Sequence, residues 1–464
     1  MQHPSKTTRR TFLRHLGVAG AGALAAPCVL SGRAWGADAP SKKLNIAMLA
    51  TGDRSRQILP SFVHENIVAV CDVNAKQVEM TLKMATEKLG EAGAAMAKAK
   101  VYDDYRKLLD AEKSVEAVVI AAGQRWHAYL SMAALKAGKH VFCEKPLAHS
   151  VLQAREIRDL ARGSKLMTQI GTQGGASETF RRSMEVMQAG VLGPITEVHC
   201  WINRTFPPSA AIDTNADPIP EGLNWDFWCG PRAVLPFKNH YLGGCLAWGR
   251  WLEFGDGHLA DMGAHGLNLP WRALKLGAAQ KVSVEINEPL KDSYPSATKF
   301  RWDFPARGDM AACTLYWHDG PKAGPPEELA KELLPTYKKV PGDGCLFAGE
   351  KGMLLSGAWG ENGVVKLKGE EKFRGVNDHE ACKPVERTLP RTHGHMQEWI
   401  EACKGGAPTF QGFGTAGDVA ELAMVGMVSL RLGKPIEWES ESLKAKGLPE
   451  ADPLIRREPR KKWL

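Results

Sequence analysis

The sequence predicts an α/β protein in which a doubly wound parallel sheet is followed by an α+β region with a large, mainly antiparallel sheet. Two observations lead to this fold class. Between residues 44 and 171, short apolar runs rich in Val and Ile alternate with amphipathic stretches, as in parallel sheets buried on both faces. After Gly171, aromatic and β-branched residues alternate with polar ones between Pro and Gly loops, which is typical of antiparallel sheets. A chain of 464 residues is long enough for two domains.

Each apolar run of the first region is expected to form one strand, and the intervening stretches have helical periodicity. The expected strands are 44–49, 67–73, 115–123, 140–145 and 166–171. The expected helices are 76–89, 128–137 and 152–162. Gly138 follows the second helix as a C-terminal stop before the next strand.

The second region contains four clear strand patterns and two late helices. The strands are expected within 195–204, 281–288, 297–306 and 311–320, and the helices at 395–404 and 415–432. Pro-rich or polar stretches at 206–222, 321–345 and 361–385 are expected to be loops.

The first 36 residues have the composition of a targeting segment. Thr8 to Arg14 reads TRRTFLR, a twin-arginine pattern, and a weakly apolar run follows from Leu16 to Leu30. In Ala34-Trp35-Gly36, small residues stand at the positions that a signal peptidase reads, so cleavage is expected after Gly36. We therefore expect an exported, periplasmic protein that folds around its cofactor before export, with an amphipathic first helix as the alternative. No further stretch is expected to span a membrane.

Composition and charge exclude several functions. With 44% hydrophobic and 24% charged residues, the chain is neither disordered nor fibrous. The formal charge is +8, but the targeting segment contributes five basic residues and no acid, so 55 basic and 52 acidic residues remain. A nearly balanced mature chain argues against a nucleic-acid partner. The ten cysteines include no CxxC pair, so structural zinc is not expected, and any disulfide stays unassigned.

A dinucleotide site is expected where the first strand ends. A phosphate-binding fingerprint would place glycines at 50, 52 and 55, where the chain has Ala50, Gly52 and Ser55. Asp72 ends the second strand, 20 residues after Gly52, where its carboxylate would accept the ribose hydroxyls and repel a 2′-phosphate. The pattern indicates a Rossmann-type domain and favours NAD, while Arg54 and Arg56 leave NADP open.

Several motifs together resemble the Gfo/Idh/MocA superfamily, which includes glucose–fructose oxidoreductase and inositol dehydrogenase, and look closest to its exported twin-arginine branch. The first are Glu144-Lys145-Pro146 after a strand, Tyr102-Asp103-Asp104-Tyr105, and Trp126-His127. The others are IGTQ at 170–173, LNWDFWCGP at 223–231, FGDGHLADMGAH at 254–265, FPARG at 304–308 and the segment 395–404. The expected organisation is a signal peptide at 1–36, a dinucleotide-binding domain at 43–171, and a substrate-binding and oligomerisation domain at 172–464, and the resemblance extends over nearly all of the mature chain. The resemblance implies a homo-oligomer.

Hydride transfer to or from a carbinol needs a base for the hydroxyl proton and a positive group beside the developing alkoxide. Lys145 suits the second role, with a pKa that burial would lower. Asp261 and His265 are four residues apart, so on one helix the carboxylate would help to hold the imidazole. The resemblance gives His265 the acid/base role. The expected cofactor-binding residues are Gly52, Asp53, Arg54, Ser55, Asp72, Trp126, His127, Glu144 and Lys145.

The predicted function is an exported NAD(P)-dependent oxidoreductase acting on CH–OH groups of a sugar, sugar derivative or polyol. One alternative is a nicotinamide-dependent glycoside-cleaving enzyme that oxidises, eliminates and reduces again. Another is a non-catalytic sugar-binding protein, which would not need Lys145, Asp261 and His265 together. No metal is expected, although His258, His393 and His395 leave one open. Eight of the fourteen Trp lie between Trp201 and Trp317, and one or two are expected in the site.

Overall fold

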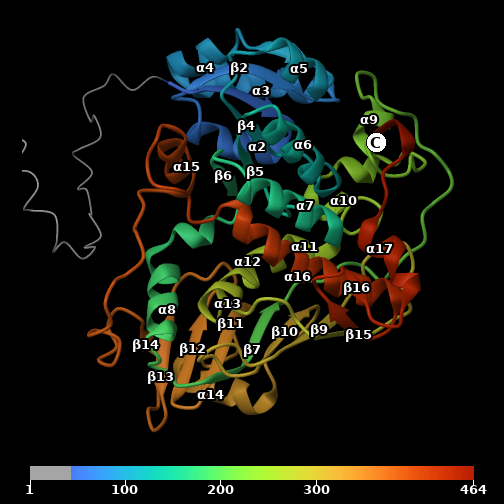
Figure 1. The fold of residues 1–464 in the computed structure, drawn as a ribbon. Coiled ribbons are helices and arrows are strands. Elements are labelled where there is room, and N and C mark those ends of the chain that lie inside the picture. The colour runs from blue at the N-terminus through green and yellow to red at the C-terminus, as the bar shows by residue number, and fades with distance from the viewer. Residues whose placement is uncertain (1–42, 464) are drawn as a thin grey trace, which may run out of the picture. The chain divides into compact units, whose positions relative to one another are not determined.

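The computed structural model describes residues 43–463, so the expected signal segment lies outside the described residues. Residues 44–464 group into one unit that contains two sheets, and Figure 1 shows one sheet at each end of it. The first sheet is parallel throughout, with strand order β3-β2-β1-β4-β5-β6. Its strands are β1 (Asn45–Leu49), β2 (Asn66–Cys71), β3 (Lys100–Tyr102), β4 (Ala117–Ile120), β5 (His140–Cys143) and β6 (Thr168–Ile170).

Helices cover both faces of this sheet, as the doubly wound fold requires. The helices are α2 (Asp53–Ile58), α3 (Ala75–Lys88), α4 (Gly90–Met96), α5 (Tyr105–Ala111), α6 (Gln124–Lys136) and α7 (Val151–Arg162). Side chains of α2, α3 and α4 pack in the core of one face, together with Trp399 from α15 (His395–Cys403), a helix from the far end of the chain. Side chains of α5, α6 and α7 pack in the core of the other face.

The second sheet has ten strands in the order β14-β13-β12-β11-β7-β10-β9-β8-β15-β16. All its neighbouring pairs are antiparallel except β7 with β10. This confirms the predicted fold class. The strands are β7 (Ile195–Ile202), β8 (Lys281–Ile286), β9 (Thr298–Phe304), β10 (Cys313–Asp319), β11 (Asp343–Gly349), β12 (Gly352–Ser356), β13 (Val364–Leu367), β14 (Arg374–Gly375), β15 (Ile436–Glu439) and β16 (Lys444–Ala445).

One helix joins the cores of the two sheets. The first turn of α16 (Phe413–Leu432) packs against the parallel sheet through Phe413 and Ala416, and the rest packs in the core of the large sheet. Its length and apolar composition would suffice to cross a membrane, but 78% of that window is buried inside the protein. We therefore interpret α16 as a core helix. The remaining helices are α8 (Glu178–Gln188), α9 (Trp225–Cys229), α10 (Cys245–Trp248), α11 (Gly257–Asp261), α12 (Gly263–Gly266), α13 (Asn268–Ala273), α14 (Glu327–Tyr337) and α17 (Asp452–Arg456).

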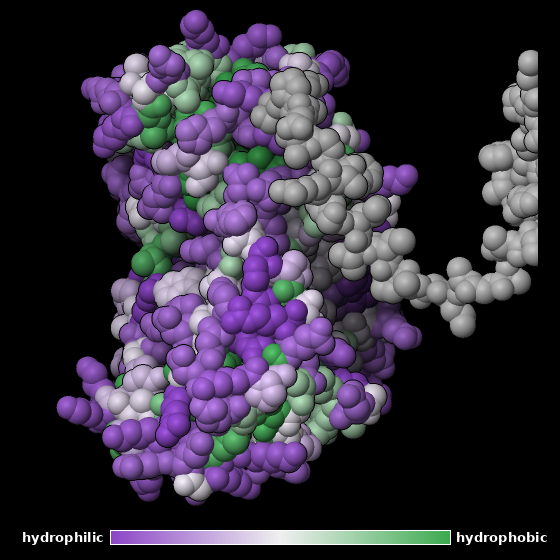
Figure 2. All heavy atoms as spheres, turned by 90° about the vertical axis from the view of Figure 1, so that its left-hand side faces the viewer, coloured by the Kyte–Doolittle hydropathy of each residue, from purple (hydrophilic) through white to green (hydrophobic). Residues whose placement is uncertain are grey.

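Two of the expected loops are wrong in part. The stretch 321–345 contains α14 and the start of β11, and the stretch 361–385 contains β13 and β14. Pro326 and Pro335 flank and interrupt the pattern of α14, but Leu333 is fully buried against the outer face of the large sheet and holds the helix there. The stretch 206–222 contains no helix or strand. Figure 2 shows one face of the molecule, on which hydrophilic side chains predominate and hydrophobic ones are scattered.

Candidate functional site

A cavity of about 470 Å³ opens at the carboxyl ends of the parallel strands. Its walls come from the ends of β1, β2, β4 and β5, and from the segments 227–228 and 241–248 of the second region. The strand order reverses between β1 and β4, so the cavity lies at the switch point where open α/β sheets bind ligands.

The turn after β1 leaves room for a ligand. Ala50 has a φ of 69°, in the left-handed region, at the position where the fingerprint would have its first glycine. Gly52 lines the cavity, and a Cβ added there would meet nothing within 4 Å. The backbone is therefore open to close approach by a pyrophosphate, as the sequence predicts for this glycine. Ser55, at the third fingerprint position, is fully buried and does not line the cavity.

Asp72 lines the cavity and also stabilises the turn after β1 by accepting hydrogen bonds from it. Its Oδ2 accepts hydrogen bonds from the Thr51 N–H at 2.6 Å and the Thr51 hydroxyl at 2.9 Å, and its Oδ1 accepts one from the Asn74 N–H at 2.9 Å. Burial raises the pKa of Asp72 above its ordinary value, although these bonds oppose the shift. A carboxylate has about four lone-pair sites, so Asp72 keeps acceptor capacity for ribose hydroxyls.

The two arginines that left NADP open are already engaged by the protein. Arg54 Nη2 lies 2.7 Å from Oε1 of Glu144, and both residues line the cavity. Arg56 donates to the Thr51 carbonyl at 2.9 Å and to Gln77 at 2.8 Å, and it pairs with Asp53. Asp53 itself lines the cavity and is exposed. A guanidinium already committed to a carboxylate is a poor partner for a 2′-phosphate, so the geometry favours NAD.

Lys145 connects the turn after β5 to α11 through an ion pair. It follows β5, lines the cavity, and its Nζ lies 2.5 Å from Oδ1 of Asp261, the last residue of α11. Burial alone would lower the pKa of the ammonium, but the charge and hydrogen bond of Asp261 outweigh burial and raise it. The expected lowered pKa is therefore wrong, because the carboxylate stands directly beside Nζ. Lys145 is a charged donor rather than a base.

His265 lies apart from the cavity. It is 3% exposed, its Nδ1 is buried without a hydrogen-bond partner, and neither it nor Asp261 lines the cavity. Burial, and then the charge of Lys145, hold the pKa of His265 well below its ordinary value, so the imidazole is neutral. The expected shared helix is wrong: Asp261 ends α11, His265 lies in α12, and the Asp261 carboxylate pairs with Lys145.

Trp126 and His127 have different surroundings. Trp126 lines the cavity, donates its indole N–H to the Phe227 carbonyl at 3.1 Å, and meets the ring of Trp463 edge-on at 4.9 Å. The C-terminal residues thus pack behind this wall. His127 does not line the cavity: its Nδ1 lies 2.6 Å from the carbonyl oxygen of Pro146, which fixes the turn after Lys145. His127 therefore positions the turn and does not itself face the cavity.

The opposite wall contains residues that were not predicted for the site. Tyr241, Cys245, Leu246 and Trp248 line the cavity from the segment around α10, and Leu246 is 49% exposed. Trp228 and Trp248 are the two tryptophans of the 201–317 group in the cavity wall, which agrees with the expected one or two. The Gly243-Gly244 pair is the signal in the sequence that could have indicated this wall. Gly244 has a φ of 89°, a conformation that lets the short segment turn over the cavity.

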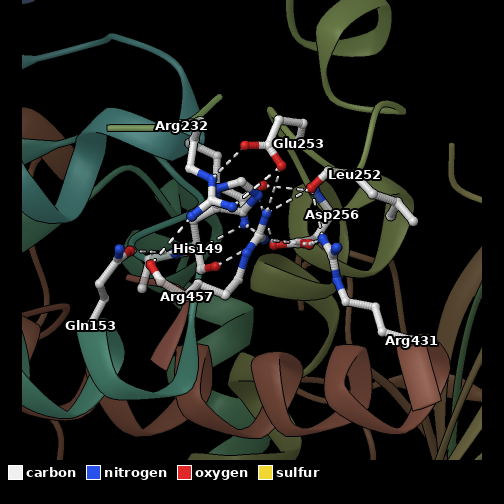
Figure 3. A network of polar contacts seen from close by, with 10 residues as sticks. His149, Gln153, Arg232, Leu252, Glu253, Asp256, Arg431 and Arg457 are labelled. Atoms are coloured by element: carbon white, nitrogen blue, oxygen red, sulfur yellow. Dashed lines mark hydrogen bonds and ion pairs between the residues drawn. The ribbon is translucent and has the colours of Figure 1, made fainter. Parts of the chain in front are cut away.

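A buried ionic network holds the start of α11 (Figure 3). Asp256 is 1% exposed, and its Oδ1 lies 2.9 Å from Arg431 Nη2 and 3.5 Å from Arg457 Nη1. Arg457 also donates to the carbonyl of His149 at 3.1 Å. Burial and the charge of Arg457 hold the pKa of His149 well below its ordinary value. The network ties α16 and the C-terminal segment to the helix that ends in Asp261.

No metal site emerges in residues 43–463, where no group of three or more His, Cys, Asp or Glu is arranged to hold an ion. His395 instead lies 2.7 Å from the Ile170 carbonyl oxygen through Nε2, and His258 stacks on Phe206 at 4.0 Å. The nine cysteines within the described range are all free thiols.

Family models match both regions of the chain. Residues 44–172 match the Gfo/Idh/MocA model described as "Oxidoreductase family, NAD-binding Rossmann fold". Residues 183–304 match its companion, "Oxidoreductase family, C-terminal alpha/beta domain". Together the two matches cover more than half of the chain.

Inositol 2-dehydrogenases are among the similar curated proteins. That of Azotobacter vinelandii is 32% identical over 210 residues, which is 42% of this chain and 59% of the relative. That of Salmonella typhimurium is 32% identical over 158 residues, which is 34% of this chain and 43% of the relative. The chain thus matches only about half the length of these relatives.

Solved structures share the fold. The WlbA dehydrogenase from Bordetella pertussis, in complex with NADH and UDP-GlcNAcA, has a TM-score of 0.57 at 14% identity and covers 86% of this chain and 98% of its own. The aldose-aldose oxidoreductase from Caulobacter crescentus, complexed with glycerol, has a TM-score of 0.56 at 15% identity, covering 85% of this chain and 99% of its own.

Proposed function

This chain belongs to the Gfo/Idh/MocA oxidoreductase family, and on that premise we propose that it transfers hydride between NAD(H) and a CH–OH group of a sugar, sugar derivative or polyol. The observation that carries the proposal is the ion pair between Lys145 and Asp261 at the wall of the strand-end cavity. A bound nicotinamide dinucleotide supplies the hydride donor or acceptor.

The residues fit a dinucleotide. Gly52 leaves open space at the turn where a pyrophosphate would lie, and Asp72 would hold the ribose hydroxyls. Arg54 and Glu144 would close the wall near Lys145, and Trp126 would form an apolar side.

Lys145 and His265 then divide the chemistry at the carbinol. The Lys145 ammonium, kept charged by Asp261, donates a hydrogen bond to the substrate oxygen and stabilises the negative charge that develops there. His265, neutral and with a free Nδ1, takes the hydroxyl proton in this proposal, which requires substrate to reach beyond the cavity wall.

The test is single-turnover absorbance near 340 nm on a panel of sugars and inositols. Before it, mass spectrometry of gently purified protein establishes whether a nicotinamide dinucleotide co-purifies. We expect reduction of bound NAD by at least one substrate. Release of an aglycone without net NADH would instead support the glycoside-cleaving alternative, and saturable sugar binding with no absorbance change would support a binding protein.

We also propose export by the twin-arginine route and assembly into a homo-oligomer. The export proposal is supported by Arg9, Arg10 and the apolar run that follows. Replacing both with Lys should leave the full-length protein in the cytoplasm, because the receptor distinguishes guanidinium groups from charge alone. Normal processing of that double variant would count against the route. Light scattering of the processed protein tests the oligomer, and a monomer at micromolar concentration would contradict it.

A further inference from the structure

Arg125 differs from the other cations of the cavity. Among the described residues, three cationic side chains line it: Arg54, Arg125 and Lys145. Arg54 lies 2.7 Å from a Glu144 oxygen, and Lys145 lies 2.5 Å from an Asp261 oxygen. Within residues 43–463, no carboxylate lies within ion-pair distance of the Arg125 guanidinium. Its Nε donates to the Trp228 carbonyl at 2.7 Å, and its Nη1 is buried with no hydrogen-bond partner.

This unpaired charge is deeply buried. Arg125 is 3% exposed, and its guanidinium stacks on the Trp228 ring at 3.6 Å. Burial lowers the pKa of the guanidinium, and no neighbouring carboxylate compensates. A buried charge without a partner is strongly destabilising, so its presence at a cavity wall indicates that a ligand supplies the counter-charge.

The same place is also the N-terminus of a long helix. α6 runs for 13 residues from Gln124, and its N-cap, Gly123, lines the cavity and provides no side-chain cap. The first N–H groups of a helix lack intrahelical partners, and the helix dipole favours an anion there. The guanidinium N–H groups of Arg125 therefore add hydrogen-bond donors at a helix N-terminus that already favours an anion.

The residues around Arg125 indicate which kind of anion would bind there. Cys245 and Trp248 of α10 line the same cavity as Lys145 and Arg125, and the Trp248 ring lies 5.7 Å from the Arg125 guanidinium. α10 therefore forms one wall of the cavity that both cationic side chains line. The aromatic neighbours of Arg125 are Trp228, Trp248 and Phe254, all from the second region rather than from the turn at Gly52.

We propose that Arg125 and the N-terminus of α6 form a subsite for a carboxylate of the substrate, so that the substrate is an acidic sugar or a sugar acid. This inference rests on the proposed function and specifies its substrate class. Because Arg125 and Lys145 line the same cavity, one substrate would place its carboxylate at Arg125 and its carbinol beside Lys145.

Binding measurements test the subsite without turnover. The probes are D-glucuronate, D-galacturonate and D-gluconate, each compared with the neutral amide of the same acid, on protein saturated with NADH, which cannot accept hydride from the probe. We expect the wild type to bind at least one acid tenfold or more tightly than its amide. Arg125→Gln should abolish that preference and leave NADH affinity within threefold. Arg125→Lys, which keeps the charge but not the guanidinium N–H groups, should retain part of the preference.

Lys136→Gln is the matched control, because it removes one charge from the exposed C-terminal turn of the same helix and should change neither measurement. If no acid is preferred over its amide by the wild type, the proposal is wrong, and this comparison needs no variant to fold. If Arg125→Gln weakens NADH binding tenfold, the anion is the cofactor pyrophosphate and the proposal is also wrong. Absence of hydride transfer on every sugar would instead overturn the proposed function, while the binding comparison would still decide the subsite.

Discussion

Gln124 and Asp256 are joined by two hydrogen bonds: Gln124 Nε2 donates to Asp256 Oδ2 at 2.9 Å, and the Asp256 N–H donates to Gln124 Oε1 at 3.0 Å. The first residue of α6 is thereby fixed to the residue that precedes α11. Arg125 follows Gln124 in α6, and Asp256 precedes α11, whose last residue, Asp261, binds Lys145. The anion subsite and the ion pair are therefore held by one buried connection.

Removing the charge of Asp256 should destabilise the whole protein. Asp256→Asn would leave Arg431 and Arg457 buried without their shared carboxylate, and loss of one partner from a buried ionic group typically costs about 3–5 kcal/mol. Urea unfolding measures the change. Asp103→Asn is the control, because that side chain is 73% exposed, and a change of about 0.5 kcal/mol or less is expected there. Equal effects of the two variants would show that the network contributes little.

The Lys145–Asp261 pair predicts a pH effect. In the wild type, Asp261 raises the pKa of Lys145 and burial lowers it. Asp261→Asn removes the largest influence that raises this pKa while burial remains, so the ammonium loses its proton at a lower pH and activity should decline earlier on the alkaline side. The pH profile of hydride transfer measures this shift. Asp103→Asn, a change after the edge strand β3, which three other strands separate from β5 and Lys145, should leave the alkaline limb in place. An unchanged limb in Asp261→Asn would contradict the role given to the pair.

The sheets and the switch-point cavity could be predicted from the sequence because Val- and Ile-rich runs with intervening helices allow few other topologies. β3 was missed because it has only three residues and Val101 is 56% exposed, so it contributes no apolar run. α14 was missed because its prolines are typical of loops, although a buried leucine on the sheet face outweighs them.

The site was predicted only as far as local motifs extend. Motif positions identified Lys145 and Asp72, which both line the cavity. The partner of Asp261 could not be predicted, because α11 ends at this residue and the turn after β5 brings Lys145 to it. Arg125 could not be recognised either, since its missing partner becomes visible only when every neighbouring carboxylate has a known position.

Ala50 stands where the phosphate-binding fingerprint would place its first glycine, and replacing it tests whether that position is strained. A left-handed conformation costs an L-residue roughly 1–2 kcal/mol, and glycine avoids this while losing about 0.5–1 kcal/mol more chain entropy. Ala50→Gly should therefore raise the free energy of unfolding by about 0.5–1 kcal/mol in urea titrations. Ala47→Gly, in the buried middle of β1, should lower it by about 1 kcal/mol. Destabilisation by both changes would show that Ala50 is unstrained.

Asp72 should determine the choice between NADH and NADPH. Its carboxylate would repel a 2′-phosphate, and it also holds the Thr51 N–H and hydroxyl. Asp72→Ser should weaken NADH binding and reduce the preference over NADPH, both read by fluorescence titration. Thr51→Val removes only the hydroxyl bond and serves as the control, with the preference retained. Equal affinity of the wild type for NADH and NADPH would show that Asp72 does not select the cofactor.

Lys145→Ala and His265→Ala should each abolish turnover while NADH binding stays nearly unchanged, because both act at the carbinol rather than at the pyrophosphate or ribose. Loss of a general base such as His265 commonly reduces rates by about 10²- to 10⁴-fold, and loss of a donor that stabilises a developing oxyanion, as Lys145 does, by about 10²- to 10³-fold. The two variants should differ in melting temperature, since Lys145 lines the cavity whereas His265 is 3% exposed and does not line it. His265→Gln keeps most of the volume, so a low rate in both His265 variants with an unchanged melting temperature would assign chemistry rather than packing. Single-turnover absorbance near 340 nm, alongside a cofactor titration, makes the measurement on the first active substrate. A rate within tenfold of the wild type in His265→Gln would mean that the proton leaves by another route and that the buried imidazole only supports α12.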